Sequence, residues 1–255
     1  MSPFSADQYR EEGYTGPIRL FSPEQAAAHR RSFYEAIGQD EERPGPATST
    51  VAGFNLQHRW AHEIATHPVL LDRIEEVLGP NLVCWAMYFW YKEPHNGKYI
   101  PWHQDAVYWP MKPRINMTAW VALGPTSKEN GCLRVIPGSH KEWLDEHYQD
   151  LDAAAQLGRG LTADQVDESR AVDFEMSPGE VVFFSEATLH SSTPNISDIP
   201  RVACSIRYTT PEVLFDTAEV LKRFAHVRPI LVRGDDPYGH NDAIAGQIPT
   251  ETPYP

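Results

Sequence analysis

The sequence predicts a mainly-β protein in which helices back an antiparallel sandwich or barrel. Helical patterns are confined to the N-terminal third, and a series of short strands rich in β-branched and aromatic residues follows. Turns containing Gly, Pro or Asn separate these strands. Strands and helices do not alternate and no glycine-rich phosphate loop is present, which disfavours a Rossmann or P-loop enzyme.

Two helices are expected before residue 80. Ser22, Pro23 and Gln25 occupy the N-cap, N1 and N3 positions of a capping box and begin a helix over AAAHRRSFYEAIG. Pro68 begins a second helix, PVLLDRIEEVL, which Gly79 ends.

The 255 residues fit a single domain. We divide it into a helical part (about 1–80), a β core (about 81–210) and a C-terminal extension (about 211–255). The last stretch, from about Arg233, is polar and rich in Pro, Gly and Asp, so a loosely held tail is expected there.

The expected strands have polar faces that carry the chemistry. Because successive side chains of a strand point to opposite faces, Thr118 and Trp120 share one polar face, and Arg201 and Arg207 share another. Apolar residues fill the opposite faces, and periodicity alone leaves open whether the polar faces meet water or a cavity. The strands are expected at 82–92, 115–123, 132–136, 181–184 and 201–209.

The charge excludes several classes of partner. The chain has 22 Lys and Arg against 35 Asp and Glu, a net charge of −13, which disfavours nucleic acid and anionic membranes. The three cysteines form no CxxC pair, and no signal peptide or apolar run of membrane-spanning length is evident. We expect a cytoplasmic protein, monomer or homodimer, that acts on a small molecule.

Residues 141–180 hold much of the negative charge. Eleven acidic and three basic side chains place −8 of the net −13 in this segment. A solvated, partly helical insert and a lid over a site both fit this pattern.

His103, Asp105 and His190 form the candidate metal site. Residues i and i+2 of an extended segment point the same way, so His103 and Asp105 can reach one ion, and His190 follows a buried strand with the same alternation. Two histidines and one carboxylate make the facial triad of non-haem Fe(II) oxygenases, whereas zinc more often takes four protein ligands, or three and a water. Arg201 could bind a carboxylate projecting from the metal, or form a surface ion pair.

Five motifs in order resemble the phytanoyl-CoA dioxygenase family, whose members are Fe(II)- and 2-oxoglutarate-dependent oxygenases. The resemblance runs from roughly Tyr88 to Tyr208 and implies a double-stranded β-helix (jelly roll, cupin-like) backed by N-terminal helices. That fold would turn the polar strand faces inward onto the metal. The motifs are PWHQD (101–105), TAWVAL (118–123), NGCLRVIPGSHK (130–141), GEVVFF (179–184) and LHSSTPN (189–195), followed by Arg201.

The resemblance assigns roles residue by residue. It implies that Fe(II) is bound by His103, Asp105 and His190. It implies that 2-oxoglutarate is bound by Arg201 at the distal carboxylate, by Ser192 beside it, and by Trp120, Thr118 and Tyr88. A polar residue upstream of the strands corresponds to Gln57 or Asn55.

The substrate pocket is expected around the metal. Tyr108 and Trp109 are the expected walls, with Trp102 nearby, and Arg207 would meet an anionic substrate group or pair with a buried acid. Related sequences with an HQDxxYW stretch act on small metabolites, which points to secondary metabolites, alkylphosphonates or quaternary amines.

Three functions are therefore compatible with the sequence. The first is hydroxylation of a small metabolite with O₂, releasing succinate and CO₂. The second is a different outcome in the same family, such as desaturation, cyclisation or halogenation, although related halogenases lack the carboxylate that Asp105 supplies here. The third is a cupin-like protein that binds a metal or ligand without oxygenase activity, against which Arg201 and Ser192 argue.

Overall fold

A computed structural model describes most of the chain. The expected tail lies largely outside the described residues. The structure describes residues 4–39, 50–109, 111–144, 148–215 and 227–239.

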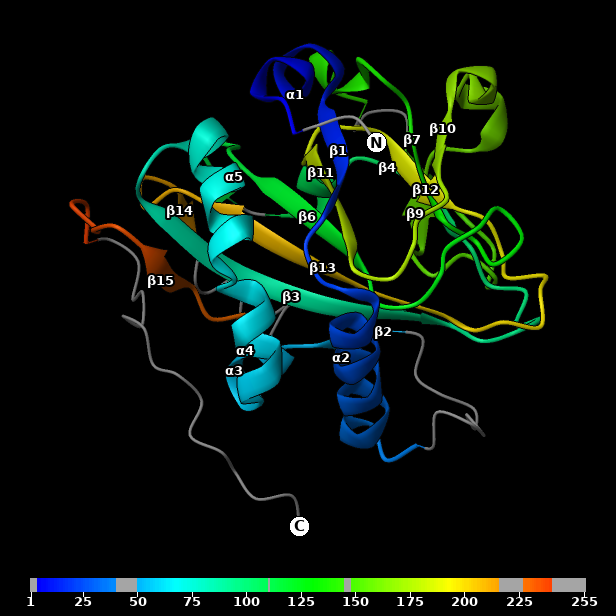
Figure 1. Ribbon diagram of the computed structural model, residues 1–255. Helices are drawn as coiled ribbons and strands as arrows, with labels where there is room; N and C mark the ends of the chain where they lie inside the picture. Colours follow the sequence, from blue (N-terminus) through cyan, green and yellow to red (C-terminus); the bar gives the residue numbers. More distant parts are fainter. Residues whose placement is uncertain (1–3, 40–49, 110, 145–147, 216–226, 240–255) are drawn as a thin grey trace.

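The larger sheet contains seven antiparallel strands in the order β1-β11-β6-β13-β3-β15, and β2 also pairs with β3 (Figure 1). All of the expected strands that belong to it are present within two residues of their expected limits. Its strands are β1 (Tyr14–Arg19), β2 (Thr50–Ala52), β3 (Leu82–Lys92), β6 (Met117–Ala122), β11 (Glu180–Ser185), β13 (Arg201–Thr209) and β15 (Ile230–Arg233).

A smaller sheet of four antiparallel strands, ordered β10-β7-β12-β4, packs against the larger one. Apolar side chains of both sheets, among them Trp120, Phe184, Leu133 and Phe174, meet in one buried cluster between them. This arrangement confirms the predicted double-stranded β-helix. The strands of the smaller sheet are β4 (Ile100–His103), β7 (Leu133–Val135), β10 (Val172–Phe174) and β12 (His190–Ser192).

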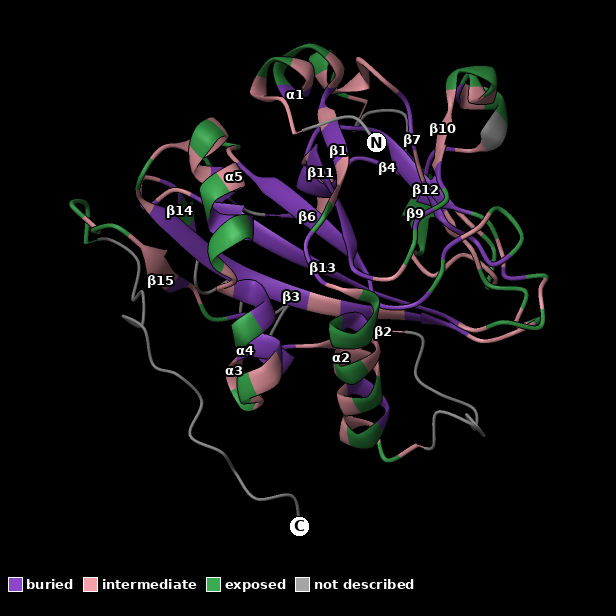
Figure 2. Ribbon diagram, viewed as in Figure 1, coloured by how far each residue is buried: buried purple, intermediate pink, exposed green. Residues whose placement is uncertain are grey.

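Helices cover the other face of the larger sheet (Figures 1 and 2). Their buried residues, such as Phe33 and Leu70, join Met117, Val121 and Cys204 of the sheet in the main core. The opposite strand faces, which carry Trp120 and the two arginines of β13, turn toward the smaller sheet, as alternation predicts. The α-helices are α1 (Ala6–Glu12), α2 (Pro23–Ala36), α3 (Phe54–Gln57), α4 (Arg59–Ala65) and α5 (Pro68–Leu78).

The helix ends agree with the sequence. The Ser22 hydroxyl accepts from the Gln25 N–H and the Gln25 side chain accepts from the Ser22 N–H, which is the reciprocal pair of a capping box. Gly79 follows α5 with φ +90°, a backbone conformation that favours glycine. No helix among the described residues is long and apolar enough to cross a membrane.

The expectation that the N-terminal third holds only helices was wrong. β1 pairs with β11, and β2 pairs with β3. β1 was not predicted because Gly16 and Pro17 form a dipeptide that is typical of a turn. They lie where the register shifts between Thr15 and Ile18, and an edge strand tolerates such a bulge.

The acidic segment lies against the smaller sheet. Its described residues contain short strands and 3₁₀ turns rather than α-helix, and they form isolated bridges with Tyr99, just before β4, at Ala155 and with Trp102 of β4 at Leu161. Tyr148, Leu161 and Val166 pack with Trp102 in a buried cluster. Residues 145–147 of this segment lie outside the described part. The remaining short elements are β5 (Met111–Lys112) with β14 (Leu214–Phe215), β8 (Gln149–Asp150) with β9 (Arg159–Gly160), and 3₁₀ helices η1 (Asp105–Tyr108), η2 (Ser139–Lys141), η4 (Ala163–Gln165) and η5 (Glu168–Arg170).

Candidate metal and co-substrate site

His103, Asp105 and His190 come together at one end of the smaller sheet. His103 ends β4 and His190 begins β12, and the two are register partners with ring centroids 4.0 Å apart. The His103 Nε2 lies 3.6 Å from Asp105 Oδ1, and the His190 Nε2 lies 3.9 Å from Asp105 Oδ2. One ligand atom from each buried side chain lies within 4.8 Å of the others, and no other such group occurs among the described residues.

Two details of this geometry differ from the sequence argument. Asp105 is not on the strand with His103 but starts the 3₁₀ helix η1, which turns its carboxylate toward the imidazoles. His190 does not continue the alternation of β11, because the chain crosses from the larger to the smaller sheet between Ser185 and His190. The three side chains converge as predicted, but through backbone conformations other than the strand alternation expected from the sequence.

Hydrogen bonds fix both imidazoles in the form that binds a metal. The Nδ1 of His103 lies 2.8 Å from the Pro101 carbonyl, and the Nδ1 of His190 lies 2.9 Å from the Thr188 carbonyl. A carbonyl only accepts, so each Nδ1 carries a proton and Nε2 is the ring nitrogen that each histidine turns toward the cluster. Burial and the neighbouring His103 lower the pKa of His190 to about 3, which keeps it neutral at ordinary pH.

Arg207 holds the carboxylate ligand. Its Nη1 donates to Asp105 Oδ2 and, at 3.2 Å, to the Thr118 hydroxyl, while the guanidinium lies 4.5 Å from the Trp109 ring centroid and 5.2 Å from that of Tyr88. Burial alone would raise the pKa of Asp105, but the charge of Arg207 outweighs it and holds that pKa below its usual range. Asp105 is therefore ionised, as a metal ligand must be.

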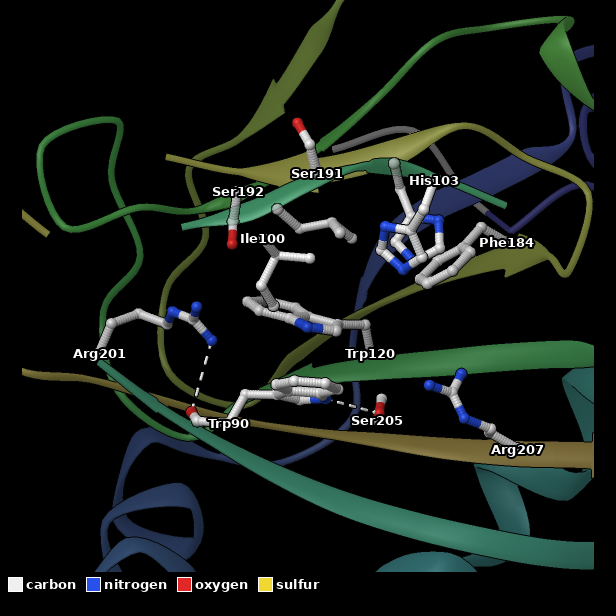
Figure 3. Close-up of a pocket in the computed structure, with 12 residues that line it drawn as sticks. Trp90, Ile100, His103, Trp120, Phe184, Ser191, Ser192, Arg201, Ser205 and Arg207 are labelled. Atoms are coloured by element: carbon white, nitrogen blue, oxygen red, sulfur yellow. Dashed lines mark hydrogen bonds between the residues drawn. The ribbon is translucent and has the colours of Figure 1, made fainter. Parts of the chain in front are cut away.

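A pocket leads from the triad to a buried arginine (Figure 3). Arg201 is 1% exposed, and no carboxylate of a described residue lies within ion-pair distance of it. Its Nη1 donates to the Trp90 carbonyl at 3.4 Å, but within the described part of the chain neither its Nε nor the hydroxyl of Ser192 in the same pocket has a hydrogen-bond partner. Burial lowers the pKa of Arg201 to about 10, so the group remains a cation. A buried cation without an anion is costly, and a ligand carboxylate would satisfy it.

The pocket is walled by aromatic and aliphatic side chains between these two ends. Trp120 lies in the middle, with its ring centroid 5.6 Å from the Arg201 guanidinium carbon. The Trp90 indole N–H donates to the Ser205 hydroxyl at 2.8 Å and closes one side (Figure 3). The chemistry of its two ends suits a metal chelator with a distal carboxylate. Further lining residues are Ile100, Leu133, Phe184, Ser191, Ser192 and Ser205.

Comparison with known proteins decides the family. Residues 9–203 match the sequence model of the family described as Phytanoyl-CoA dioxygenase (PhyH). The chain belongs to the phytanoyl-CoA dioxygenase family. The relatives it matches are named as dioxygenases, one of them alpha-ketoglutarate-dependent, and the His103–Asp105–His190 cluster agrees with the predicted Fe(II) and 2-oxoglutarate enzyme class.

Two relatives and one solved structure illustrate the range of similarity. The human peroxisomal phytanoyl-CoA dioxygenase is 31% identical over 181 residues, 69% of this chain but 54% of the human protein, so this chain spans about half of that relative's length. A probable alpha-ketoglutarate-dependent hypophosphite dioxygenase of Stutzerimonas stutzeri is 25% identical over 222 residues, 80% of this chain and 77% of that protein. The solved structure of ThoJ apo, a non-heme monooxygenase, is 27% identical with a TM-score of 0.75 and covers 96% of this chain and 88% of ThoJ.

Some residues expected in the phytanoyl-CoA dioxygenase pocket lie elsewhere. Trp102 points away from the metal, because it precedes His103 on the same strand, and it stacks with Arg134 on the outer face of the smaller sheet. Gln57 is exposed on α3, and Asn55 is buried against Cys84 on the helix side of the larger sheet. Neither lines the pocket.

Tyr108, Trp109, Tyr88 and Thr118 lie near the triad without lining the pocket. The Tyr108 ring centroid is 6.0 Å from that of His103, and its hydroxyl donates to the Arg159 carbonyl of the acidic segment at 2.5 Å. The other three surround Arg207, which lines the pocket and pairs with the buried Asp105. The pairing was one of its two expected roles.

Several pocket residues were not predicted from the sequence. Trp90 shares the inward face of β3 with Tyr88, and Ser205 shares that of β13 with Arg201, so strand parity carried the signal. Ile100 and Phe184 are apolar and gave no sign that distinguishes them from the core. Glu186 was also missed: it is 6% exposed, accepts from the Asn116 N–H at 3.0 Å, and burial raises its pKa to about 7.

Proposed function

We propose that this protein is an Fe(II)- and 2-oxoglutarate-dependent dioxygenase that hydroxylates an unactivated carbon of a small metabolite, with release of succinate and CO₂. One observation carries the proposal: a single pocket joins the two histidines of the His103–Asp105–His190 cluster to a buried arginine that has no carboxylate partner among the described residues. A simple metal binder has no need for the second feature.

Each residue has a defined part in this proposal. His103, Asp105 and His190 would hold Fe(II), and Arg201 with Ser192 would bind the distal carboxylate of 2-oxoglutarate along Trp120. When bound, the metal and co-substrate supply the oxidising chemistry, in which O₂ is consumed, 2-oxoglutarate becomes succinate and CO₂, and one oxygen atom is delivered to the substrate. The protein positions the partners and excludes water from the apolar pocket.

The presence of Asp105 favours hydroxylation over halogenation, because the carboxylate and its Arg207 partner fill the place that a halide would need. Desaturation and cyclisation use the same ligand set, so product analysis separates them. For the substrate we propose a small free metabolite in the cytosol, a compartment that suits three buried, unpaired cysteines.

An anaerobic titration tests the proposal. Fe(II) is added to the metal-free protein, then 2-oxoglutarate, and visible absorption is recorded. Bidentate binding of 2-oxoglutarate to the metal should produce a weak charge-transfer band, absent in His103→Ala and requiring more co-substrate in Arg201→Ala. Iron binding without any band would overturn the oxygenase proposal and favour a cupin-like binder. If the band appears, succinate release across a panel of small metabolites identifies the substrate.

A further inference from the structure

Lys92 is a second buried cation beside Arg201. It is the last residue of β3, is 1% exposed, and is the register partner of Arg201 on β13. No carboxylate of a described residue lies within ion-pair distance of it. Long cationic side chains are almost never fully buried unless paired, so its position requires an explanation.

The surroundings of Lys92 are built around its amine. Nζ donates to the Ser192 carbonyl at 3.2 Å and to the Thr193 carbonyl, both at the end of β12. Gly131 leaves room for this contact: a Cβ there would lie 3.2 Å from Lys92 Nζ and 2.3 Å from the Thr193 oxygen, and its φ of +75° favours glycine. The two N–H groups of a neutral amine match the two carbonyls, and a third N–H has no acceptor among the described residues.

We propose that Lys92 is a positioning residue for the 2-oxoglutarate end of the pocket: it ties the Ser192–Thr193 backbone to the larger sheet and takes up a proton when the co-substrate carboxylate reaches Arg201. The inference rests on the proposed function, because it assigns the anion to Arg201 and Ser192. Lys92 does not line the pocket, so it acts through these two residues.

The groups that face Lys92 favour proton uptake by its amine when a carboxylate binds to Arg201. Arg201 faces it from β13 and the Cys132 thiol from the turn before β7, while β12 contributes only carbonyls. Burial first, and then repulsion from Arg201, lower the pKa of Lys92 to about 6, whereas burial raises that of Cys132 to about 11, so the thiol stays neutral. A carboxylate bound to Arg201 removes the repulsion and adds attraction, which raises the pKa of Lys92.

The sign of the pH effect follows. Below about pH 6 the Lys92 amine is already charged, so the protein takes up few protons when 2-oxoglutarate binds. Above that value the amine is neutral in the free enzyme and becomes charged on binding, so affinity for 2-oxoglutarate should fall as pH rises from 6.5 to 8. We expect the Kd to rise several-fold per pH unit in that interval, up to about ten-fold for one whole proton.

Isothermal titration calorimetry of the full-length, Mn(II)-loaded protein tests the proposal. 2-Oxoglutarate is added at pH 7.5 in two buffers of different ionisation heat, which reports the protons taken up. About half a proton or more per co-substrate is expected, falling to about a quarter or less at pH 5.5. No proton uptake by a wild type that binds 2-oxoglutarate would overturn the inference, while failure of the loaded wild type to bind 2-oxoglutarate would overturn the proposed function and this inference with it.

Two variants assign the proton. Lys92→Met should abolish the uptake and flatten the dependence of Kd on pH, whereas Lys128→Met, an exposed lysine on the nearby turn that pairs with Asp173, should retain both. Uptake that persists in Lys92→Met would assign the proton to another group and reject the proposal. Should Lys92→Met not fold, Lys92→Arg, which stays charged, should likewise abolish the uptake, and uptake that persists in it would reject the proposal.

Discussion

Arg207 and Asp105 form a buried pair at the metal site, with side chains 7% and 5% exposed. In the metal-free protein, Arg207→Met leaves Asp105 as an uncompensated buried charge, which typically costs about 3–5 kcal/mol. A divalent cation restores the compensation. The variant should therefore lower the melting temperature of the metal-free protein far more than that of the Mn(II)-saturated protein, measured by differential scanning calorimetry. An equal loss in both states would mean that Arg207 contributes through packing alone.

Asp105→Ala removes a ligand itself. Loss of an outer-shell partner alone commonly costs 10–100-fold in metal affinity or activity, so we expect turnover to fall by more than about 100-fold. The measurement is 2-oxoglutarate-dependent succinate release, with Asp150→Ala, an exposed acid, as the control. Wild-type rates in Asp105→Ala would remove this residue from the metal site.

Glu186 predicts a pH dependence of stability. Its folded pKa, about 7, lies above the usual value of 4.5, so the protonated form is favoured by folding. Stability from this group is present below pH 4.5 and is lost as pH rises through 7, a difference on the order of 3 kcal/mol. Glu186→Gln should match the wild type near pH 4.5 and exceed it at pH 8 in urea unfolding. Equal stabilities of the wild type and Glu186→Gln at pH 8 would contradict a raised pKa of Glu186.

Single site residues could be predicted from the sequence where the chemistry allows only a few residue types. The pattern of His103, Asp105 and His190 identified three side chains that the structure brings together. The prediction failed for Gln57, because nothing in a helix sequence tells which side of a sheet it will cover. Lys92 gave no signal, since its burial depends on three segments distant in sequence.

Among the elements, the end of α1 is joined to the segment that carries His190. Gly13, with φ +79°, accepts from the Thr188 hydroxyl at 2.7 Å and the Ser185 N–H at 2.9 Å, and a Cβ there would lie 2.5 Å from His140. Gly13→Ala should therefore cost more than the about 1–2 kcal/mol of left-handed strain alone and should also weaken Fe(II) binding.

Gly38→Ala is the matched control. Gly38 has φ +68° but a Cβ there meets nothing within 4 Å, so only the backbone strain applies. Urea midpoints and Fe(II) titrations of both variants separate the two contributions. Equal losses of stability with unchanged iron affinity would show that the contact of Gly13 with the 185–190 segment is unimportant.

Elements with a strong local pattern were predictable, and those defined by pairing were not. β3 and β13 agree with their expected limits because each is a long run of β-branched and aromatic residues. β4 and β12, which carry the metal ligands, are short and lie beside polar turns, so their strand character depends on each other and on β7. Alternation could not follow the chain across its change of sheet after Ser185.

The stability of the whole molecule should depend on its ligands, because the proposed metal site and the proposed 2-oxoglutarate site exist only in the folded state. Mn(II) and 2-oxoglutarate, each near 100 times its Kd, should stabilise the protein by about 2.7 kcal/mol apiece. In a chain of this size each kcal/mol corresponds to about 2–4 °C, so the pair should raise the melting temperature by about 10–20 °C under anaerobic conditions. In His103→Ala the metal-dependent part should disappear, and its persistence would place the metal elsewhere.

The overall fold was predictable as a class, but its three-dimensional order was not. Helices before strands and inward polar faces indicated a helix-backed double-stranded β-helix. The strand order and the pairing of β1 with β11 bring together residues more than 160 positions apart, such as Tyr14 and Phe184, which local periodicity cannot specify.

β4 is the outermost strand of the smaller sheet, and an open strand of this kind invites pairing with another molecule. The acidic segment occupies that margin, with the Gln156 and Leu161 N–H groups bonded to the carbonyls of Tyr99 and Trp102. Its surplus of negative charge repels a second copy of the same surface. The segment therefore shields the strand that carries His103 from pairing with another molecule, and shortening it should make the protein self-associate.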